Sequence, residues 1–208
     1  MSGIVEQSRW WGVRRPRHRR PLAGAQRLIL EYVRVLVTGM SGVGKSALVR
    51  ELRRRRFTAY DADDDGFSEP RADGRWGWRA ELVADLLARH TDGLLFFAGC
   101  SEEQIALPFD VRVLLTVPQP VLVKRLRTRS GNPYGRDAAE LAQVLADRDE
   151  IEPLLRRSAD LVLTTTAPPP ELADRVLGRI AELGARRARP DRLAGGSCAD
   201  RGGAGFPS

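Results

Sequence analysis

The feature that most constrains this chain is a short apolar run that leads directly into a glycine-rich loop. Residues 33–37 are mainly β-branched and aliphatic, which predicts a buried strand. Residues 39–46 then read GMSGVGKS, and apolar residues at helical spacing follow as far as Leu52. This order of strand, loop and helix predicts an α/β unit with the loop at the carboxyl edge of a sheet.

A loop of this kind is built to hold phosphate. Glycines allow successive backbone N–H groups to turn inward around phosphate oxygens, and the following helix adds its positive N-terminal end. Lys45 is expected to reach the β- and γ-phosphates, and the Ser46 hydroxyl is expected to hold Mg²⁺. The residues expected to contact the nucleotide here are Gly39, Met40, Ser41, Gly42, Val43, Gly44, Lys45, Ser46 and Ala47. The alternative interpretation is a glycine-rich turn without a ligand.

The charge of the chain lies at its ends. The formal net charge of the 208 residues is +7, of which residues 1–32 contribute +5 and residues 185–208 contribute +3. We therefore predict a basic disordered arm over 1–32, a folded domain that carries the phosphate loop over 33–183 and a disordered Arg/Gly/Ala-rich tail over 184–208. Both ends are expected to be solvated rather than bound to nucleic acid. The alternatives for the arm are that it binds nucleic acid or that translation begins near Val33.

The two cysteines do not suggest a disulfide framework. Cys100 and Cys198 are far apart, and Cys100 is expected to be a buried thiol near the mouth of the site. No stretch approaches the roughly 18 apolar residues that cross a bilayer, and the arginines of residues 14–20 are not followed by a signal core. We expect a cytoplasmic protein, monomeric or homodimeric, without a membrane partner.

A group of carboxylates follows the second predicted strand, residues 57–60. Asp61 and Asp63 are two residues apart, so an extended chain would present both from one side, where they could contact Mg²⁺ or a substrate hydroxyl. Asp63 with Ser46 is the expected metal pair. The alternative is an acidic turn. Residues 63–66 also fit the D-x-x-G pattern of GTPases, but no N-K-x-D sequence follows.

The remaining chain alternates helices with strands. Strands are predicted at 94–98, 111–117 and 160–164, and helices at 79–89, 121–129, 137–157 and 171–183, whereas 67–78 is expected to be a loop with packing tryptophans at 76 and 78. Alternation of this kind predicts a parallel sheet covered on both faces. Arg79 begins a helix, so it either binds an anionic substrate group or is an exposed arginine without a special role.

Arginines bracket a glycine-containing turn at residues 130–136. Arg125 and Arg129 precede this turn and Arg136 ends it. Cations around a short turn are suited to closing over phosphates, because phosphoryl transfer depends mainly on positioning and charge neutralisation. The alternative is a solvated basic helix end.

Together these motifs resemble the P-loop small-molecule kinases, which include shikimate, gluconate, adenylate and dephospho-coenzyme A kinases. The resemblance spans about residues 33–183. It implies a three-layer fold with a five-stranded parallel sheet in the order 2-3-1-4-5 and a small lid. Residues 39–46 match the phosphate loop, Asp61-Ala62-Asp63 matches the Asp-x-Asp after the second strand, and Arg129 and Arg136 are the lid candidates, with Arg125 behind them.

Other positions match this family less closely. Trp78-Arg79 resembles the Phe-Arg-x-x-Glu that grips the substrate carboxylate in shikimate kinases, but Glu81 falls one position early. The three glycines of their third strand correspond here to Gly99-Cys100-Ser101. Gly99 is therefore the only one of the three expected to contact the substrate. The resemblance places Thr166 and Pro168 around the adenine.

The implied function is transfer of the γ-phosphoryl group of ATP, with Mg²⁺, to a small hydroxylated or phosphorylated metabolite. Lys45 and Mg²⁺ on Ser46 would neutralise developing charge, and Asp61 or Asp63 would orient the acceptor hydroxyl or accept its proton. Arg125, Arg129 and Arg136 would close over the phosphates. The alternatives are a regulatory P-loop ATPase without a small-molecule acceptor, or a nucleic-acid-associated ATPase that uses the basic arm.

Overall fold

A computed structural model of the chain describes residues 32–72, 74–129 and 135–187. The elements follow one another as β1 (Tyr32–Thr38), α1 (Lys45–Arg54), β2 (Thr58–Asp61), β3 (Ser68–Pro70), β4 (Trp76–Trp78), α2 (Ala80–Arg89), β5 (Gly93–Ala98), a 3-10 turn (Glu102–Ile105), β6 (Val111–Thr116), α3 (Gln119–Thr128), α4 (Ala138–Ser158), β7 (Leu161–Thr164) and α5 (Pro169–Arg187). The expected basic arm, most of the tail and the centre of the expected lid turn lie outside the described residues.

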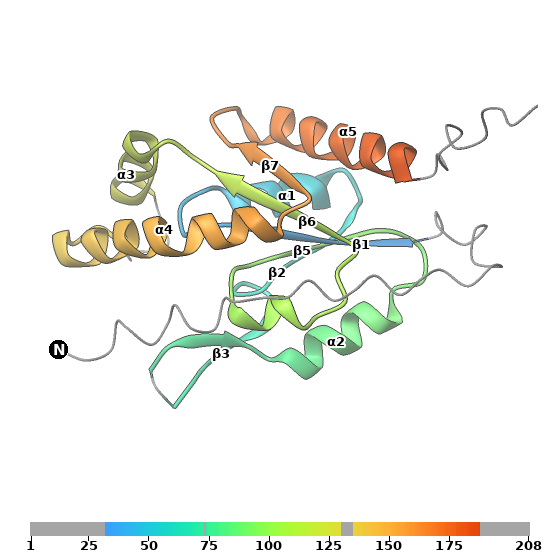
Figure 1. Cartoon of the computed structure of the whole chain (residues 1–208), viewed down its shortest axis with the longest axis horizontal. Coiled ribbons are helices and arrows are strands. Elements are labelled where there is room, and N and C mark those ends of the chain that lie inside the picture. The colour runs from blue at the N-terminus through green and yellow to red at the C-terminus, as the bar shows by residue number, and fades with distance from the viewer. Residues whose placement is uncertain (1–31, 73, 130–134, 188–208) are drawn as a thin grey trace, which may run out of the picture.

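Five strands form one parallel sheet in the order β2-β5-β1-β6-β7. Counted along the chain without the small β3–β4 hairpin, this order is 2-3-1-4-5, which confirms the predicted topology. Helices cover both faces of the sheet: α5 lies above it and α2 below it in Figure 1, and α1 packs beside α5.

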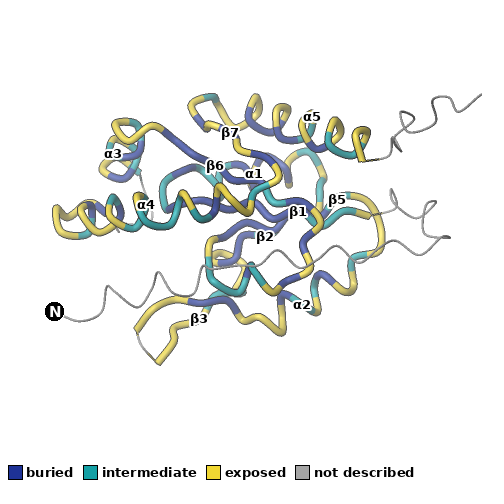
Figure 2. Tube along the Cα trace, in the orientation of Figure 1, coloured by how far each residue is buried: buried dark blue, intermediate teal, exposed yellow. Residues whose placement is uncertain are grey.

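Two apolar clusters, one on each face, hold the layers together. Leu48 and Leu52 of α1 and Val176 of α5 pack against one face, and Val83 and Leu87 of α2 pack against the other. The central strands β1, β5 and β6 are buried over most of their length in Figure 2, as expected for strands covered on both faces. Their near-continuous apolar runs therefore account for the rigid platform beneath the glycine-rich loop.

The strand register fixes which residues meet at the carboxyl edge of the sheet. Asp61 is paired with Ala98, and Ala98 is paired with Val37, one residue before the end of β1. Because neighbouring strands are about 4.8 Å apart, Asp61 lies roughly 10 Å from β1. The second strand therefore ends at the same edge of the sheet as the loop that follows β1, with β5 between them.

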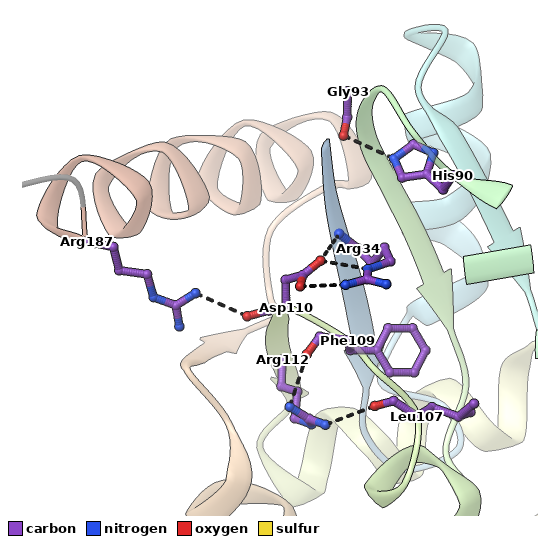
Figure 3. Close-up of polar contacts among 8 residues, drawn as sticks. All are labelled: Arg34, His90, Gly93, Leu107, Phe109, Asp110, Arg112 and Arg187. Carbon is purple, nitrogen blue, oxygen red and sulfur yellow. Dashed lines mark hydrogen bonds and ion pairs between the residues drawn. The ribbon is translucent and has the colours of Figure 1, made fainter. Parts of the chain in front are cut away.

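Polar contacts join the segments at the opposite edge of the sheet, and Figure 3 shows those that Arg34 and Arg187 make with Asp110. The Arg34 guanidinium donates two hydrogen bonds to the Asp110 carboxylate, each 2.9 Å long, which raises the pKa of Arg34. Arg187 donates to the Asp110 carbonyl oxygen (3.1 Å) and to the carboxylate of Asp160 (2.9 Å). The last turn of α5 is thereby joined to the start of β6.

Two element predictions were wrong. Residues 68–78 form an antiparallel β3–β4 hairpin instead of an irregular loop, because Ser68 pairs with Trp78 and Pro70 with Trp76. The last helix continues to Arg187, four residues beyond its expected end, and the Arg187 contacts supply the reason. Within the described residues, none of the helices has the length and apolarity needed to cross a bilayer.

Candidate functional site

The loop between β1 and α1 has a backbone that only glycine adopts readily. Gly39, Gly42 and Gly44 have φ values of +141°, +85° and +108°. A Cβ atom on Gly39 would lie 2.4 Å from the carbonyl oxygen of Leu115, so the loop passes directly over β6. Met40 and Val43 bury their side chains in the core, which fixes the loop to the sheet. The loop is thus an anchored ring of backbone groups.

The N-terminus of α1 completes this ring. Its first turn carries no acidic residue, and its N-cap residue, Gly44, makes no side-chain hydrogen bond to the first-turn N–H groups. Unsatisfied N–H groups and the helix dipole make such a terminus attractive to anions. Lys45 folds over the loop and donates to the carbonyl oxygens of Gly39 (2.7 Å) and Met40 (3.2 Å). Ser46 and Ala47 follow in the same turn, both half-buried.

The acidic segment after β2 is a turn, so the prediction that Asp61 and Asp63 point to one side was wrong. Asp61 is 5% exposed, and its Oδ1 accepts from the backbone N–H of Asp63 at 3.1 Å. Its Oδ2 is buried without a hydrogen-bond partner in the described part of the chain. The Asp63 carboxylate is exposed and accepts from Ser68 Oγ at 2.7 Å. The extended pattern fails because Asp65 accepts from the N–H of Asp61 and folds the chain back.

Two arginines from the expected lid lie beside the phosphate loop. Arg129, just after α3, donates to Ser41 Oγ at 3.3 Å, and Arg136 donates to the carbonyl oxygen of Arg129. Burial and the positive charge of Arg136 lower the pKa of the Arg129 guanidinium. The Arg136 guanidinium therefore lies near Arg129, which itself contacts the loop through Ser41, and an anion bound there would offset the two positive charges.

Arg125 does not point into the loop in the manner expected of a phosphate ligand. Its Nη1 donates to the carbonyl oxygen of Val43 and to Oγ1 of Thr165, both at 3.1 Å. Thr165 is 1% exposed and lies just after β7. Sequence reasoning did not single out Thr165; the signal that could have found it is a polar residue directly after an apolar strand, at the ligand-binding edge. The neighbouring candidates Thr166 and Pro168 are exposed.

The expected substrate side is covered by the β3–β4 hairpin. A Cβ atom on Gly99 would lie 2.7 Å from Cζ2 of Trp78, so the indole occupies the space above this glycine. Trp78 packs as expected, whereas Trp76 is 69% exposed. Cys100 is exposed, contrary to the prediction of a buried thiol, because it follows the last residue of β5 by two positions and leaves the sheet.

The candidate Arg79 lies at the foot of the hairpin. Its Nε is 3.7 Å from the Glu69 carboxylate, and its Nη1 donates to the carbonyl oxygen of Gly66 at 3.5 Å. Its side chain is half exposed, at 49%. These contacts are long, so they leave the guanidinium able to move toward an anionic group.

The fold and this loop define the class: the chain is a P-loop nucleotide-binding protein with the fold of small-molecule kinases. Residues 35–153 match the family described as AAA domain, and the chain belongs to that family. It is similar to a nucleotide-binding protein of Rhodospirillum rubrum, 30% identical over 142 residues, which is 66% of this chain and 44% of the relative. A nucleotide-binding protein of Moorella thermoacetica is 26% identical over 156 residues, covering 68% and 50%. The chain thus spans half or less of the length of these curated relatives.

Solved structures show the same architecture. The shikimate kinase from Acinetobacter baumannii in complex with shikimate superposes with a TM-score of 0.53 at 18% identity, covering 76% of this chain and 98% of that one. The gluconokinase from Sinorhizobium meliloti 1021 gives a TM-score of 0.50 at 17% identity, covering 74% and 95%. These likenesses establish the fold.

Proposed function

We propose that this protein transfers the γ-phosphoryl group of ATP to a small hydroxylated or phosphorylated metabolite. The observation that carries the proposal is the contact of Arg129 with Ser41 of the phosphate loop, with Arg136 bonded to the Arg129 backbone, at the edge of the sheet where β2 ends in Asp61. A module that only binds nucleotide needs the loop. Phosphoryl transfer also needs cations over the transferred group and a carboxylate toward the acceptor.

In this proposal the phosphates lie in the ring formed by residues 39–47. Lys45 leaves the carbonyl oxygens of Gly39 and Met40 and donates to the β- and γ-phosphates. Arg129 and Arg136 close over the same oxygens, which relieves their mutual repulsion. Thr166 and Pro168, exposed next to Thr165, border the adenine.

The residues present fit a magnesium ion. Ser46 offers a hydroxyl in the first turn of α1, and Asp61 offers a buried carboxylate oxygen without a partner among the described residues. Asp61 is two residues after Ala59 in β2, so the two side chains point to the same face of the sheet. Ala59 packs in the same apolar cluster as Leu48 of α1 on that face. This supports Asp61 with Ser46, in place of Asp63, as the metal-side pair. When bound, Mg²⁺ would neutralise charge on the phosphates and take its other ligands from phosphate and water.

Asp63 is then left for the acceptor. Its carboxylate is exposed, and the bond from Ser68 Oγ sets its orientation. It would accept a hydrogen bond from the acceptor hydroxyl and take its proton as the phosphoryl group arrives. Arg79 would bind an anionic group on the acceptor, and Gly99 with the Trp78 indole above it would form the wall behind.

The test uses a matched pair of lysines. Lys45 and Lys124 are the only lysines in the chain, and Lys124 is exposed on α3. We expect Lys45→Ala to lower acceptor-dependent ATP consumption at least about 100-fold with unchanged thermal unfolding, while Lys124→Ala retains activity. Transfer of ³²P from γ-labelled ATP to a panel of polyols, sugars, hydroxy acids and their phosphates measures this. Wild-type turnover in Lys45→Ala would contradict the role of Lys45 in binding the β- and γ-phosphates.

A second function is supported by the names of the curated relatives, which say nucleotide-binding and mention no acceptor. A regulatory ATPase would consume ATP at the same rate with and without every compound of the panel. Acceptor-dependent consumption would exclude it.

A further inference from the structure

The Val43 carbonyl of the phosphate loop is held from outside the loop. It accepts hydrogen bonds from Oγ1 of Thr165 at 2.6 Å and from Nη1 of Arg125 at 3.1 Å. Arg125 also donates through Nη2 to the carbonyl oxygen of Thr165. The backbone N–H of Thr165 donates to the Thr116 carbonyl at 2.8 Å, so the ends of β6 and β7 are part of the same network.

Holding this carbonyl determines where the next N–H group points. The described peptide bonds are all trans, and in a trans peptide the C=O and N–H groups point in opposite directions. With the Val43 oxygen turned toward Arg125 and Thr165, the N–H of Gly44 points the other way, into the loop. This peptide joins Val43 to Gly44, and glycine tolerates either orientation of the peptide that precedes it. Without the two donors the peptide could rotate and present an oxygen to the phosphates.

We infer that Arg125 and Thr165 are positioning residues that keep the Gly44 N–H turned toward the bound phosphates. The inference rests on the nucleotide site of the proposed function. It changes the role expected for Arg125, which acts through the Val43 peptide and not as a phosphate ligand. It also links the adenine-side segment after β7 to the phosphate loop through a side chain that is 1% exposed.

Three variants of Thr165 and Arg125 separate this role from its alternatives. Thr165→Ser keeps the hydroxyl and is expected to bind inorganic triphosphate as the wild type does. Thr165→Val removes the hydroxyl, and Arg125→Met removes the second donor; each is expected to weaken triphosphate binding about 10-fold. Because both act on one carbonyl, the double variant should lose less than the product of the two single losses.

The assay is titration calorimetry with inorganic triphosphate on the full chain, with thermal unfolding measured on the ligand-free protein. Thr164→Val and Arg127→Met, whose residues are exposed on the same elements, are the matched controls. If valine at position 165 prevents folding, Thr165→Ala replaces it. A purely structural role would lower the unfolding temperature and leave the triphosphate affinity of the folded protein unchanged.

The inference is overturned if Thr165→Val binds triphosphate like the wild type, if the losses of the two single variants multiply, or if the wild type binds no triphosphate. A direct phosphate contact from Arg125 would give a loss in Arg125→Met alone. Failure of every acceptor in the transfer assay would remove the kinase proposal and leave these binding measurements intact.

Discussion

Replacing Gly39 by alanine tests whether the phosphate loop depends on its close passage over β6. Gly39 has φ +141°, and a Cβ atom there would lie 2.4 Å from the Leu115 carbonyl oxygen. Gly93, at the start of β5 and at the other edge of the sheet, is a matched control: it has φ +66° and nothing within 4 Å of its Cβ position. Both substitutions remove the same backbone freedom from the unfolded chain.

The magnitudes follow from these two environments. Alanine at a positive φ costs about 1–2 kcal/mol, which is the whole cost expected at Gly93. At Gly39 the overlap with Leu115 adds about 1–3 kcal/mol, because that carbonyl belongs to a buried central strand and cannot move away. For a domain of this size each kcal/mol lowers the unfolding temperature by about 2–4 °C.

Thermal and urea unfolding of the two variants measures the difference. We expect Gly39→Ala to lose about 2–5 kcal/mol and Gly93→Ala to lose about 1–2 kcal/mol, with triphosphate binding weakened only in Gly39→Ala. Equal losses of stability in the two variants would refute the argument from the close contact. Normal triphosphate binding in Gly39→Ala would show that the phosphate loop does not need this close contact to bind anions.

Two further predictions concern stability. Hydrogen bonds from Arg54 and Arg55 lower the pKa of Glu51 from 4.5 to about 2. The ionised Glu51 carboxylate therefore stabilises the fold fully above pH 4.5, and this stabilisation is lost as the pH falls through about 2. Glu51→Gln should flatten that part of the curve of unfolding free energy against pH, and an unchanged curve would contradict the pairing. Trp78→Ala should cost about 3–5 kcal/mol in urea unfolding, whereas Trp76→Ala, at a position 69% exposed, should cost under about 0.5 kcal/mol; similar costs would show that the indole over the sheet does not pack.

The main elements of the fold could be predicted because their signals are local. The strands of the sheet carry apolar runs, and the helices between them show apolar residues at helical spacing. The β3–β4 hairpin escaped prediction because its strands are three residues long and contain proline and glycine, which weaken any strand pattern. The end of α5 escaped because it depends on Arg187 reaching residues of two other elements.

The place of the glycine-rich loop between β1 and α1 could be predicted from the sequence, whereas the directions of the surrounding side chains could not. The phosphate loop needs glycines at fixed spacing, and these are visible in the sequence. Asp61 and Asp63 look equivalent in the sequence, but a hydrogen bond from Asp61 N–H to Asp65 makes one buried and the other exposed. The contacts of Arg125 could not be predicted, because its partners Val43 and Thr165 are 82 and 40 residues away in the sequence.

The sequence by itself determined that a strand, a glycine-rich loop and a helix would follow one another, with the loop at the carboxyl edge of a parallel sheet. Those properties come from residue type and spacing along a few turns of chain. Only the tertiary structure decided which carboxylate is buried, that an indole lies over Gly99, and which side chains hold the Val43 carbonyl. The physical reason is that these outcomes depend on contacts between strands and loops that are far apart in the chain. The local sequence allows several side-chain directions, and packing and the need to satisfy hydrogen-bonding groups determine which one is adopted.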